Sequence, residues 1–338
     1  MIVIRADINH NIGIGHIKRC ITLADSIVKH DCSVCFIVGA SGKKYIKYLT
    51  NYNVMWLDND IELNEQMDAE RTIDLLQKQR IMKSWIVVDN YKLNYKWERC
   101  IGNAGYYVAV IDDYRTRKHC ADILISDNDH PFDPALNQID KSSKVLAGKK
   151  YALIGPEYYY ADNCSIGNLH LNHLLITYGG SDPTNETVKI LNALRIFRDA
   201  NKKLFNIQRI DVVVGPANRD IDDIIESAHY LDCVVHNAPE SLHQLMKDSD
   251  LVFTSGGNSL IEALALRKPC VVTSTSDNQQ TIISQLVEEN AIYLLGSYFE
   301  LNKNNIAQKL PNILNRYRDM VQNIASRDMY DIYGADRI

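Results

Sequence analysis

MIVIRADINHNIGIGHIKRC (residues 1–20) passes from an apolar strand through a glycine turn into a segment of helical period. Gly13 and Gly15 are spaced by one residue, and His16 follows directly. Glycine lets the backbone approach a ligand closely, and free N–H groups at a helix N-terminus attract anions. The stretch therefore predicts a strand–turn–helix unit with a phosphate-binding turn. His16 is not needed for that purpose.

Strand-length apolar runs alternate with helical segments along the chain, a pattern typical of parallel sheets covered by helices on both faces. We expect strands first at 2–6, 33–38, 54–57, 85–89, 106–111 and 122–126, with helices at 16–30, 42–50, 65–81 and 94–103. After an irregular stretch from about 130 to 170, the alternation restarts at HLLITYGG (173–180) and continues with strands at 209–214, 232–235, 250–253, 270–273 and 292–295.

This pattern predicts an α/β protein with two doubly wound, Rossmann-like parallel-sheet domains facing a cleft. We place the first domain at 1–155 and the second at 156–338. The last helical stretch, about 303–327, is a candidate to pack back on the first domain. In proteins of this class the ligand lies at the carboxyl ends of the strands.

The composition excludes several classes of function. The 338 residues are 46% hydrophobic and 23% charged, with a net charge of -5, which gives no electrostatic case for nucleic acid or an anionic membrane. We find no secretory leader and no apolar run long enough to span a membrane, so we expect a cytoplasmic protein. The eight cysteines include one C-x-x-C pair, Cys32 and Cys35, which we interpret as reduced thiols.

Glycine turns at expected strand ends occur at three places and indicate binding of a diphosphate. The residues concerned are Gly13 and Gly15, then Gly179, Gly180 and Ser181, and finally Gly257, Asn258 and Ser259. None of them forms a Walker A sequence or a dinucleotide fingerprint. Glu262 lies five residues after Gly257 in the expected helix, where its carboxylate is placed to accept hydrogen bonds from a ribose diol. The alternative for Glu262 is a solvated helix position.

His16 is the candidate general base, because it opens a helix beside an expected phosphate site. Asp7, nearby in sequence with His10, is counted among the candidate catalytic residues. Asp89, Asn90 and Tyr91 follow a central strand, which is a site position in such sheets. Asp112, Asp113, His119 and Asp122 are an alternative candidate for a metal cluster, but adjacent aspartates in an extended segment point in opposite directions. We therefore predict no metal and no cofactor.

Several blocks of the sequence resemble one family. They include RADINHNIGIGHIKRCITLA, VVDNY, VIDDYRTRKHCADILI, ITYGGSDPTNET, SGGNSLIEALALRKPCVV, DNQQ and YGADRI. They are similar to the PseG family of nucleotide-sugar hydrolases, within the MurG-like GT-B superfamily. That family removes UDP from UDP-2,4-diacetamido-2,4,6-trideoxy-β-L-altropyranose in pseudaminic acid biosynthesis.

The resemblance implies a GT-B fold in which the C-terminal domain holds UDP. It implies that His16 is catalytic, that Tyr91 belongs to the same site, and that Glu262 holds the ribose. It also implies that Gly257, Asn258 and Ser259 bind the phosphates and that Asn278 and Gln279 face the sugar. The family's reaction is inverting attack of water at the anomeric carbon without a metal. Asn90, where the family commonly has histidine, and Asp277 depart from the pattern and leave the sugar and nucleotide open.

Three functions remain at this point. The first is a hydrolase acting on a UDP-sugar, releasing UDP and a free sugar for a surface glycan. The second is a MurG-like glycosyltransferase, which also requires an acceptor site. Against a lipid-linked acceptor, we find no exposed apolar or basic amphipathic stretch in the first domain. The third is a non-catalytic nucleotide-sugar-binding protein, which the intact His16 disfavours.

Overall fold

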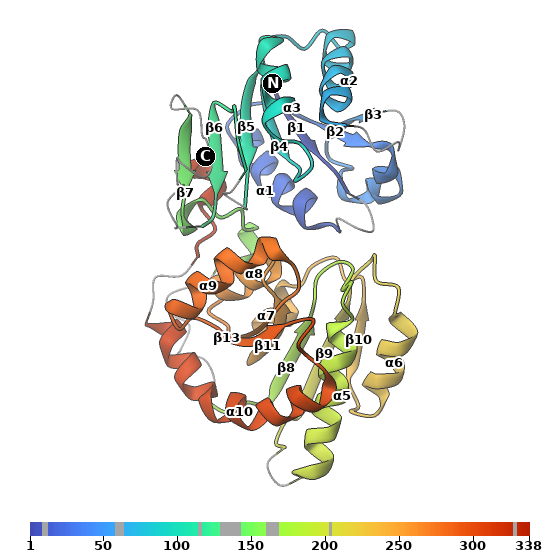
Figure 1. The fold of residues 1–338 in the computed structure, drawn as a ribbon, viewed down its shortest axis with the longest axis vertical. Helices are drawn as coiled ribbons and strands as arrows, with labels where there is room; N and C mark the ends of the chain where they lie inside the picture. The colour runs from blue at the N-terminus through green and yellow to red at the C-terminus, as the bar shows by residue number, and fades with distance from the viewer. Residues whose placement is uncertain are drawn as a thin grey trace. The chain divides into compact units, whose positions relative to one another are not determined.

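The computed structural model describes residues 1–8, 13–57, 64–113, 117–128, 143–159, 169–202, 205–326 and 330–338. The chain divides into two compact units. The N-terminal unit comprises Met1–Gly155 and Ile332–Ile338, and the C-terminal unit comprises Pro156–Asp331. Each unit is an all-parallel sheet with helices packed on it, so the predicted pair of doubly wound α/β sheets is confirmed (Figure 1).

The N-terminal unit holds a seven-stranded sheet in the order β3-β2-β1-β4-β5-β6-β7. Its strands are β1 (Ile2–Ala6), β2 (Val34–Gly39), β3 (Asn53–Leu57), β4 (Trp85–Asp89), β5 (Tyr107–Ile111), β6 (Ile123–Ser126) and β7 (Lys144–Ala147). Its helices are α1 (Gly15–Lys29), η1 (Ala40–Tyr48), α2 (Glu65–Lys78), α3 (Tyr95–Asn103), η2 (Lys149–Tyr151) and α11 (Gly334–Arg337).

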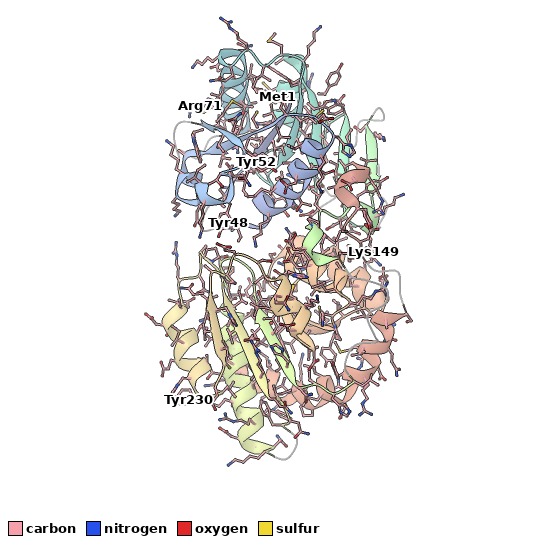
Figure 2. All side chains as sticks on the ribbon, turned by 180° about the vertical axis from the view of Figure 1, so that it is seen from behind. Met1, Tyr48, Tyr52, Arg71, Lys149 and Tyr230 are labelled. Carbon is pink, nitrogen blue, oxygen red and sulfur yellow. The ribbon has the colours of Figure 1, made fainter. Side chains whose placement is uncertain are left out.

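Apolar side chains on both sides of each strand create two cores in this unit. Ile4 of β1 packs in a core with Ile17 of α1, and Val3 packs in the other with Trp97 of α3. Alternation along a strand sends neighbouring residues to opposite faces, which is why the strands are near-continuous apolar runs. Tyr52, labelled in Figure 2, donates its hydroxyl to Asp25 of α1 and so ties the chain before β3 to that helix.

The C-terminal unit holds a six-stranded sheet in the order β10-β9-β8-β11-β12-β13. Its strands are β8 (His173–Thr177), β9 (Arg209–Val214), β10 (Val234–Asn237), β11 (Leu251–Ser255), β12 (Cys270–Ser274) and β13 (Tyr293–Ser297). Its helices are η3 (Pro156–Tyr158), α5 (Glu186–Ala200), α6 (Ile221–His229), α7 (His243–Asp248), α8 (Asn258–Ala265), η4 (Asp277–Gln279), α9 (Gln280–Glu288) and α10 (Lys303–Ala325).

The stretch expected at about 303–327 forms α10, and it packs on α5 within the C-terminal unit. The segment that belongs to the N-terminal unit is Ile332–Ile338. It docks where Ser26 of α1 donates to Asp336 and where Arg337 donates to the carbonyl of Lys150 at 2.7 Å.

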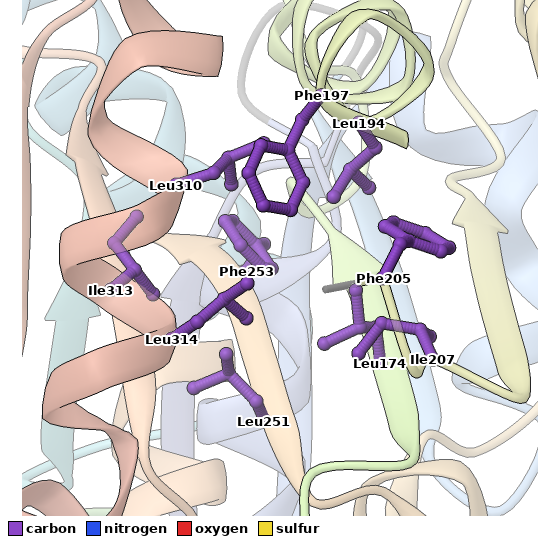
Figure 3. Close-up of a pocket in the computed structure, with 10 residues that line it drawn as sticks. All are labelled: Leu174, Leu194, Phe197, Phe205, Ile207, Leu251, Phe253, Leu310, Ile313 and Leu314. Atoms are coloured by element: carbon purple, nitrogen blue, oxygen red, sulfur yellow. The ribbon is translucent and has the colours of Figure 1, made fainter. Parts of the chain in front are cut away.

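An apolar pocket lies between α5, α10 and the sheet of the C-terminal unit (Figure 3). Phe197 of α5, Phe253 of β11 and Phe205, which precedes β9, point toward it, and its lining residues among those described are all apolar. Leu174 and Leu251, which also line it, stand at the amino ends of β8 and β11. The pocket is therefore distant from the strand ends at which ligands bind in sheets of this kind.

Candidate functional site

The strand order of each sheet reverses direction at one point, and the predicted residues gather there. In the N-terminal unit the chain winds outward from the neighbouring strands β1 and β4, and in the C-terminal unit from β8 and β11. The loops after two such strands part to opposite sides and leave room for a ligand at their carboxyl ends. His16 follows β1 and Tyr91 follows β4, while Gly179 follows β8 and Gly257 follows β11.

His16 stands in the first turn of α1, with its ring held by the end of β4. Its Nδ1 lies 2.6 Å from Oδ1 of Asp89, and the Asp89 side chain has no solvent exposure. The His16 side chain retains 13% exposure. Since an ionised carboxylate only accepts hydrogen bonds, Nδ1 carries a proton, and in the neutral form of the ring Nε2 is the nitrogen able to accept another.

Arg19 keeps Asp89 ionised. Its Nε and Nη2 each donate at 2.6 Å to one Asp89 oxygen, in the bidentate geometry that arginine makes with carboxylates. Burial alone would raise the pKa of Asp89, but Arg19, and then His16, hold that pKa below its ordinary value. Nη2 of Arg19 also lies 3.3 Å from Nδ1 of His16. The 2.6 Å contact with Asp89 is the shorter one, and it decides that Nδ1 donates to the carboxylate.

Tyr91 forms the neighbouring wall of this site. Its ring meets the His16 ring edge-on, with the centroids 4.7 Å apart, and its hydroxyl donates to Asp113. Burial and then Asp113 raise the pKa of Tyr91 well above its ordinary value, so the phenol stays neutral. Arg19 donates to Asp113 as well, at 2.8 and 2.9 Å. The structure thus brings the predicted His16 and Tyr91 together, through two aspartates and one arginine.

Asp7 joins three strand ends. It accepts hydrogen bonds from Arg5 at 2.6 and 2.9 Å, from the backbone N–H of Gly39 at 2.9 Å and from Nδ2 of Asn90 at 2.7 Å. Burial would raise the pKa of Asp7, but Arg5 holds it low. These partners give Asp7 a role in fastening the ends of β1, β2 and β4, and its catalytic role stays a prediction. His10 lies outside the described residues.

The aspartates considered as metal ligands instead form ion pairs with cationic side chains or accept hydrogen bonds from backbone N–H groups. Asp112 accepts from Arg117 at 2.6 and 2.9 Å and lies 3.3 Å from Nε2 of the buried His119, which contacts Glu98 at 2.7 Å through Nδ1. Burial would raise the pKa of Asp112, but His119 and Arg117 lower it to about 2. In the described ranges, no group of three or more His, Cys, Asp or Glu side chains is arranged to hold a metal ion.

The glycine turn before α1 has the expected geometry. Gly13 has a φ of +76°, the left-handed region that glycine occupies without strain. Gly15 is the first residue of α1, whose N-cap, Ile14, makes no side-chain cap and whose first turn carries no acidic residue.

The equivalent turn after β8 is different. Gly179 has a φ of +77°, and a Cβ on Gly215, at the end of β9, would lie 2.3 Å from the Gly179 carbonyl oxygen. Glycine at 215 therefore lets the two loops touch. Asp182, however, accepts from the backbone N–H groups of Glu186 and Thr187, both at 2.9 Å. The N-terminus of α5 is thus filled by the protein's own carboxylate, and any anion bound here meets Gly180 and Ser181 rather than that helix end.

The turn after β11 leads into α8 through a glycine. Gly257 is the N-cap of α8 without a side-chain cap, and Asn258 and Ser259 begin the helix, whose first turn has no acidic residue. Gln279 fixes this turn: its Oε1 accepts at 3.1 Å from the N–H of Gly256, and from the N–H and hydroxyl of Thr275. Gln279 therefore lies beside the expected phosphate turn. The side chain of Asn278 is outside what the structure describes.

Glu262 stands one turn further along α8, on the same helix as that N-terminus. Burial, and then this carboxylate, raise the pKa of Tyr158, which belongs to η3. The helix thus presents backbone donors at its start and a carboxylate acceptor beyond them, the combination that suits a phosphate followed by a ribose diol.

Sequence analysis missed the residues that organise His16. The sequence motifs do not single out Arg19, and they place Asp113 only in a metal cluster that the residue pattern disfavours. A usable signal was present, because Arg19 is three residues after His16 and so shares its helix face. Gly215 had no signal, because its requirement comes from a loop distant in sequence.

No protein-family model matches the chain. An uncharacterized protein of Methanocaldococcus jannaschii, MJ1062, is 24% identical over 304 residues, which cover 82% of this chain and 56% of that protein. The spore coat polysaccharide biosynthesis protein SpsG of Bacillus subtilis is 23% identical over 158 residues, which cover 47% of this chain and 45% of that protein. The chain therefore spans about half the length of the relatives it matches.

Among solved structures, the MurG of Acinetobacter baumannii superposes with a TM-score of 0.67 at 12% identity, covering 99% of this chain and 97% of MurG. The MnaA–UDP structure of S. aureus gives a TM-score of 0.67 at 13% identity, covering 99% of this chain and 94% of MnaA. The complex of Anabaena HepE with UDP and glucose gives 0.61 at 12% identity, covering 99% of this chain and 97% of HepE. This chain has the GT-B fold. At these identities the likeness establishes the fold and nothing finer.

Among the residues that the structure describes, no helix is both long and apolar enough to cross a bilayer.

Proposed function

We propose that this chain is a nucleotide-sugar hydrolase that releases UDP from a UDP-linked diacetamido-trideoxy hexose. It acts in the biosynthesis of pseudaminic acid or a related surface glycan. The observation that carries the proposal is the contact of His16 with the buried, ionised Asp89 at the end of β4. Supporting it are the sequence blocks shared with the PseG family, the UDP held by the MnaA and HepE structures, and the polysaccharide pathway named for SpsG.

In this proposal the C-terminal unit binds UDP. The N-terminus of α8, with Gly257, Asn258 and Ser259, takes the diphosphate. Glu262 accepts hydrogen bonds from the ribose diol. Gly179, Gly180 and Ser181 supply further backbone around the phosphates. Asn278 and Gln279 lie toward the sugar, as the family pattern suggests.

The N-terminal unit provides the base. Nε2 of His16 accepts a proton from water as the water oxygen bonds to the anomeric carbon, and the bond from that carbon to the diphosphate oxygen breaks with its electron pair. Asp89 holds the tautomer and stabilises the charge that develops on the ring. Diphosphate is a good leaving group, so donors that stabilise its charge suffice without a strong general acid. The opposite-face attack inverts the anomeric configuration.

A glycosyltransferase is the second candidate, and the whole-chain similarity to MurG favours it. In that case an acceptor hydroxyl replaces water as the nucleophile, with the same base. The two reactions differ in whether UDP release needs an acceptor.

The deciding experiment incubates the full chain with UDP-, GDP- and CMP-sugars in ¹⁸O-labelled water and follows nucleotide and sugar by mass spectrometry. Hydrolysis at the anomeric carbon places the label on the free sugar. Label on the phosphate would identify a pyrophosphatase, and release only after addition of an acceptor would identify a transferase. Binding of UDP without release of UDP from any donor would contradict both the hydrolase and the transferase, and would identify a non-catalytic nucleotide-sugar-binding protein.

Glu262→Gln should weaken the binding of UDP by about 10- to 100-fold, because a ribose hydroxyl loses a charged acceptor. Binding of 2′,3′-dideoxy-UDP should change little, since it has no diol. Isothermal titration calorimetry with both ligands measures the difference. Glu288→Gln, at the exposed end of α9, is the matched control and should bind both ligands as the parent does. Equal losses for both ligands in Glu262→Gln would exclude contact with the ribose.

A further inference from the structure

Arg117 is a cationic side chain to which the proposed reaction assigns no role. It follows β5 in the block VIDDYRTRKHCADILI, and its side chain is only 15% exposed. Its Nη1 donates to two backbone carbonyl oxygens, that of Tyr91 at 3.0 Å and that of Leu93 at 3.3 Å. The centre of its guanidinium group lies 5.7 Å from the centroid of the Tyr91 ring. Arg117 therefore holds the main chain of the loop after β4, which carries Tyr91.

A buried network fixes the other side of the Arg117 guanidinium. Its Nε and Nη2 donate to one oxygen of Asp112, at 2.9 and 2.6 Å, and Asp112 has no solvent exposure. The second oxygen of Asp112 lies 3.3 Å from His119, which contacts Glu98 of α3 at 2.7 Å. Burial would lower the pKa of His119, but its hydrogen bonds with Asp112 and Glu98 raise that pKa to about 9. The ring is thus a cation between two carboxylates at neutral pH, and the network holds Arg117 in one orientation.

Tyr91 is consequently held at both ends. Its hydroxyl donates to Asp113, while its carbonyl oxygen accepts from Arg117. The hydroxyl contact fixes only the tip of the side chain, whereas the contacts with the carbonyls fix the main chain from which the ring projects. Between these two points the ring lies edge-on against His16, with the centroids 4.7 Å apart. Since Asp89 already holds Nδ1 of His16, the Tyr91 ring limits how far Nε2 can swing.

We infer that Arg117 is a positioning residue for the proposed base: by fixing the main chain of Tyr91, it keeps the tyrosine ring against His16 and so directs Nε2 toward the nucleophilic water. A misplacement of about 1 Å can cost about 10²-fold in rate, so a contact behind the site affects the reaction. The effect on the reaction rests on the proposed function. The placement of Tyr91 against His16 does not.

The kinetic test is a double-mutant cycle between Arg117→Lys and Tyr91→Leu in the full chain, followed by UDP release from the donor that the labelling experiment identifies. Lysine keeps a charge for Asp112, but its single ammonium cannot reproduce a planar fork between a carboxylate and two carbonyls. Arg117→Lys alone should lower kcat by about 10- to 100-fold and leave KM within about twofold. In the Tyr91→Leu background the same substitution should lower kcat by less than about twofold, because no ring remains to be positioned.

Arg99→Lys is the matched control for the cycle. Arg99 is an exposed arginine of α3, the helix that follows the same loop. The substitution has the same chemistry and should leave kcat unchanged in both backgrounds.

A second measurement requires no turnover. In the ligand-free chain labelled at histidine, NMR follows the ring resonance of His16, which is assigned by its loss in His16→Asn. The Tyr91 ring shifts this resonance because it stands edge-on to the imidazole. Arg117→Lys should move the resonance toward its position in Tyr91→Leu, and Arg99→Lys should leave it at the parental position.

Two results would overturn the inference. Equal losses of kcat for Arg117→Lys in both backgrounds would show that Arg117 does not act through Tyr91. A His16 resonance that stays at the parental position in Arg117→Lys would show that Arg117 does not place the ring. If the resonance moves but the parent chain releases UDP from no donor, the proposed hydrolase and the effect on its reaction are wrong, while the placement of Tyr91 by Arg117 stands.

Discussion

His16→Asn should lower the rate of UDP release by about 10²- to 10⁴-fold, the usual contribution of a general base. Asparagine has no nitrogen that accepts a proton near neutral pH, so water is no longer activated. Binding of UDP should stay within about twofold, because the nucleotide residues proposed for the C-terminal unit are untouched. Single-turnover release of UDP from the donor identified by the labelling experiment, together with calorimetric binding of UDP, measures the two effects.

His30→Asn is the matched control for this prediction. His30 is the exposed C-cap of the same helix α1, so the substitution has the same chemistry at the other end of the element. It should leave release of UDP unchanged. If His16→Asn retained more than about a tenth of the parental rate, a general-base role would be excluded. His16 would then be a structural partner of Asp89.

Gly334→Ala should destabilise the N-terminal unit by about 3 kcal/mol or more, the largest stability effect that we expect. A Cβ at this position would lie 1.9 Å from the carbonyl oxygen of Ala152 and within 3 Å of two further Ala152 backbone atoms. Backbone atoms cannot turn aside as a flexible side chain does. The segment Ile332–Ile338 would have to leave its place beside α1, with loss of the contact between Ser26 and Asp336.

Gly102→Ala provides the control for this clash. Gly102 lies in α3 of the same unit, and nothing stands within 4 Å of a Cβ built there. Alanine should therefore stabilise the helix by about 0.5–1 kcal/mol. Differential scanning calorimetry of both variants measures the shifts in Tm. A Tm for Gly334→Ala as high as that of Gly102→Ala would show that the C-terminal segment does not pack tightly on Ala152.

Most strands could be predicted because parallel strands buried on both faces must be continuous apolar runs. WIVVD, expected at 85–89, is β4 at those same residues. β7 was missed because it is a short edge strand beginning with an exposed lysine, Lys144, and edge strands need few apolar residues. The helix expected at 42–50 is a 3₁₀ helix at Ala40–Tyr48. Gly42 lies so close to Val38 and Ile8 that a Cβ there would clash with both side chains.

The candidate site was predictable as far as local sequence reaches. A histidine after a glycine turn and a glutamate inside a glycine-led helix are adjacent-residue patterns, and both stand at the ends of central strands. In parallel sheets of this kind, ligands bind at the carboxyl ends of the strands, so the histidine and the glutamate were each expected near a binding region of their own unit. Local sequence did not reveal that Asp182 fills the N-terminus of α5, although it lies only four residues before Glu186.

The sequence by itself determined the two doubly wound sheets, the glycine turns and the identity of the candidate base, because each depends on residues within a few positions of one another. Only the tertiary structure decided what surrounds that base. Asp89 reaches His16 across 73 positions, and Asp113 reaches Arg19 across 94. Burial makes such pairs necessary, because a charged group removed from water requires a partner, and the tertiary structure supplies it. No local pattern can specify which partner that is.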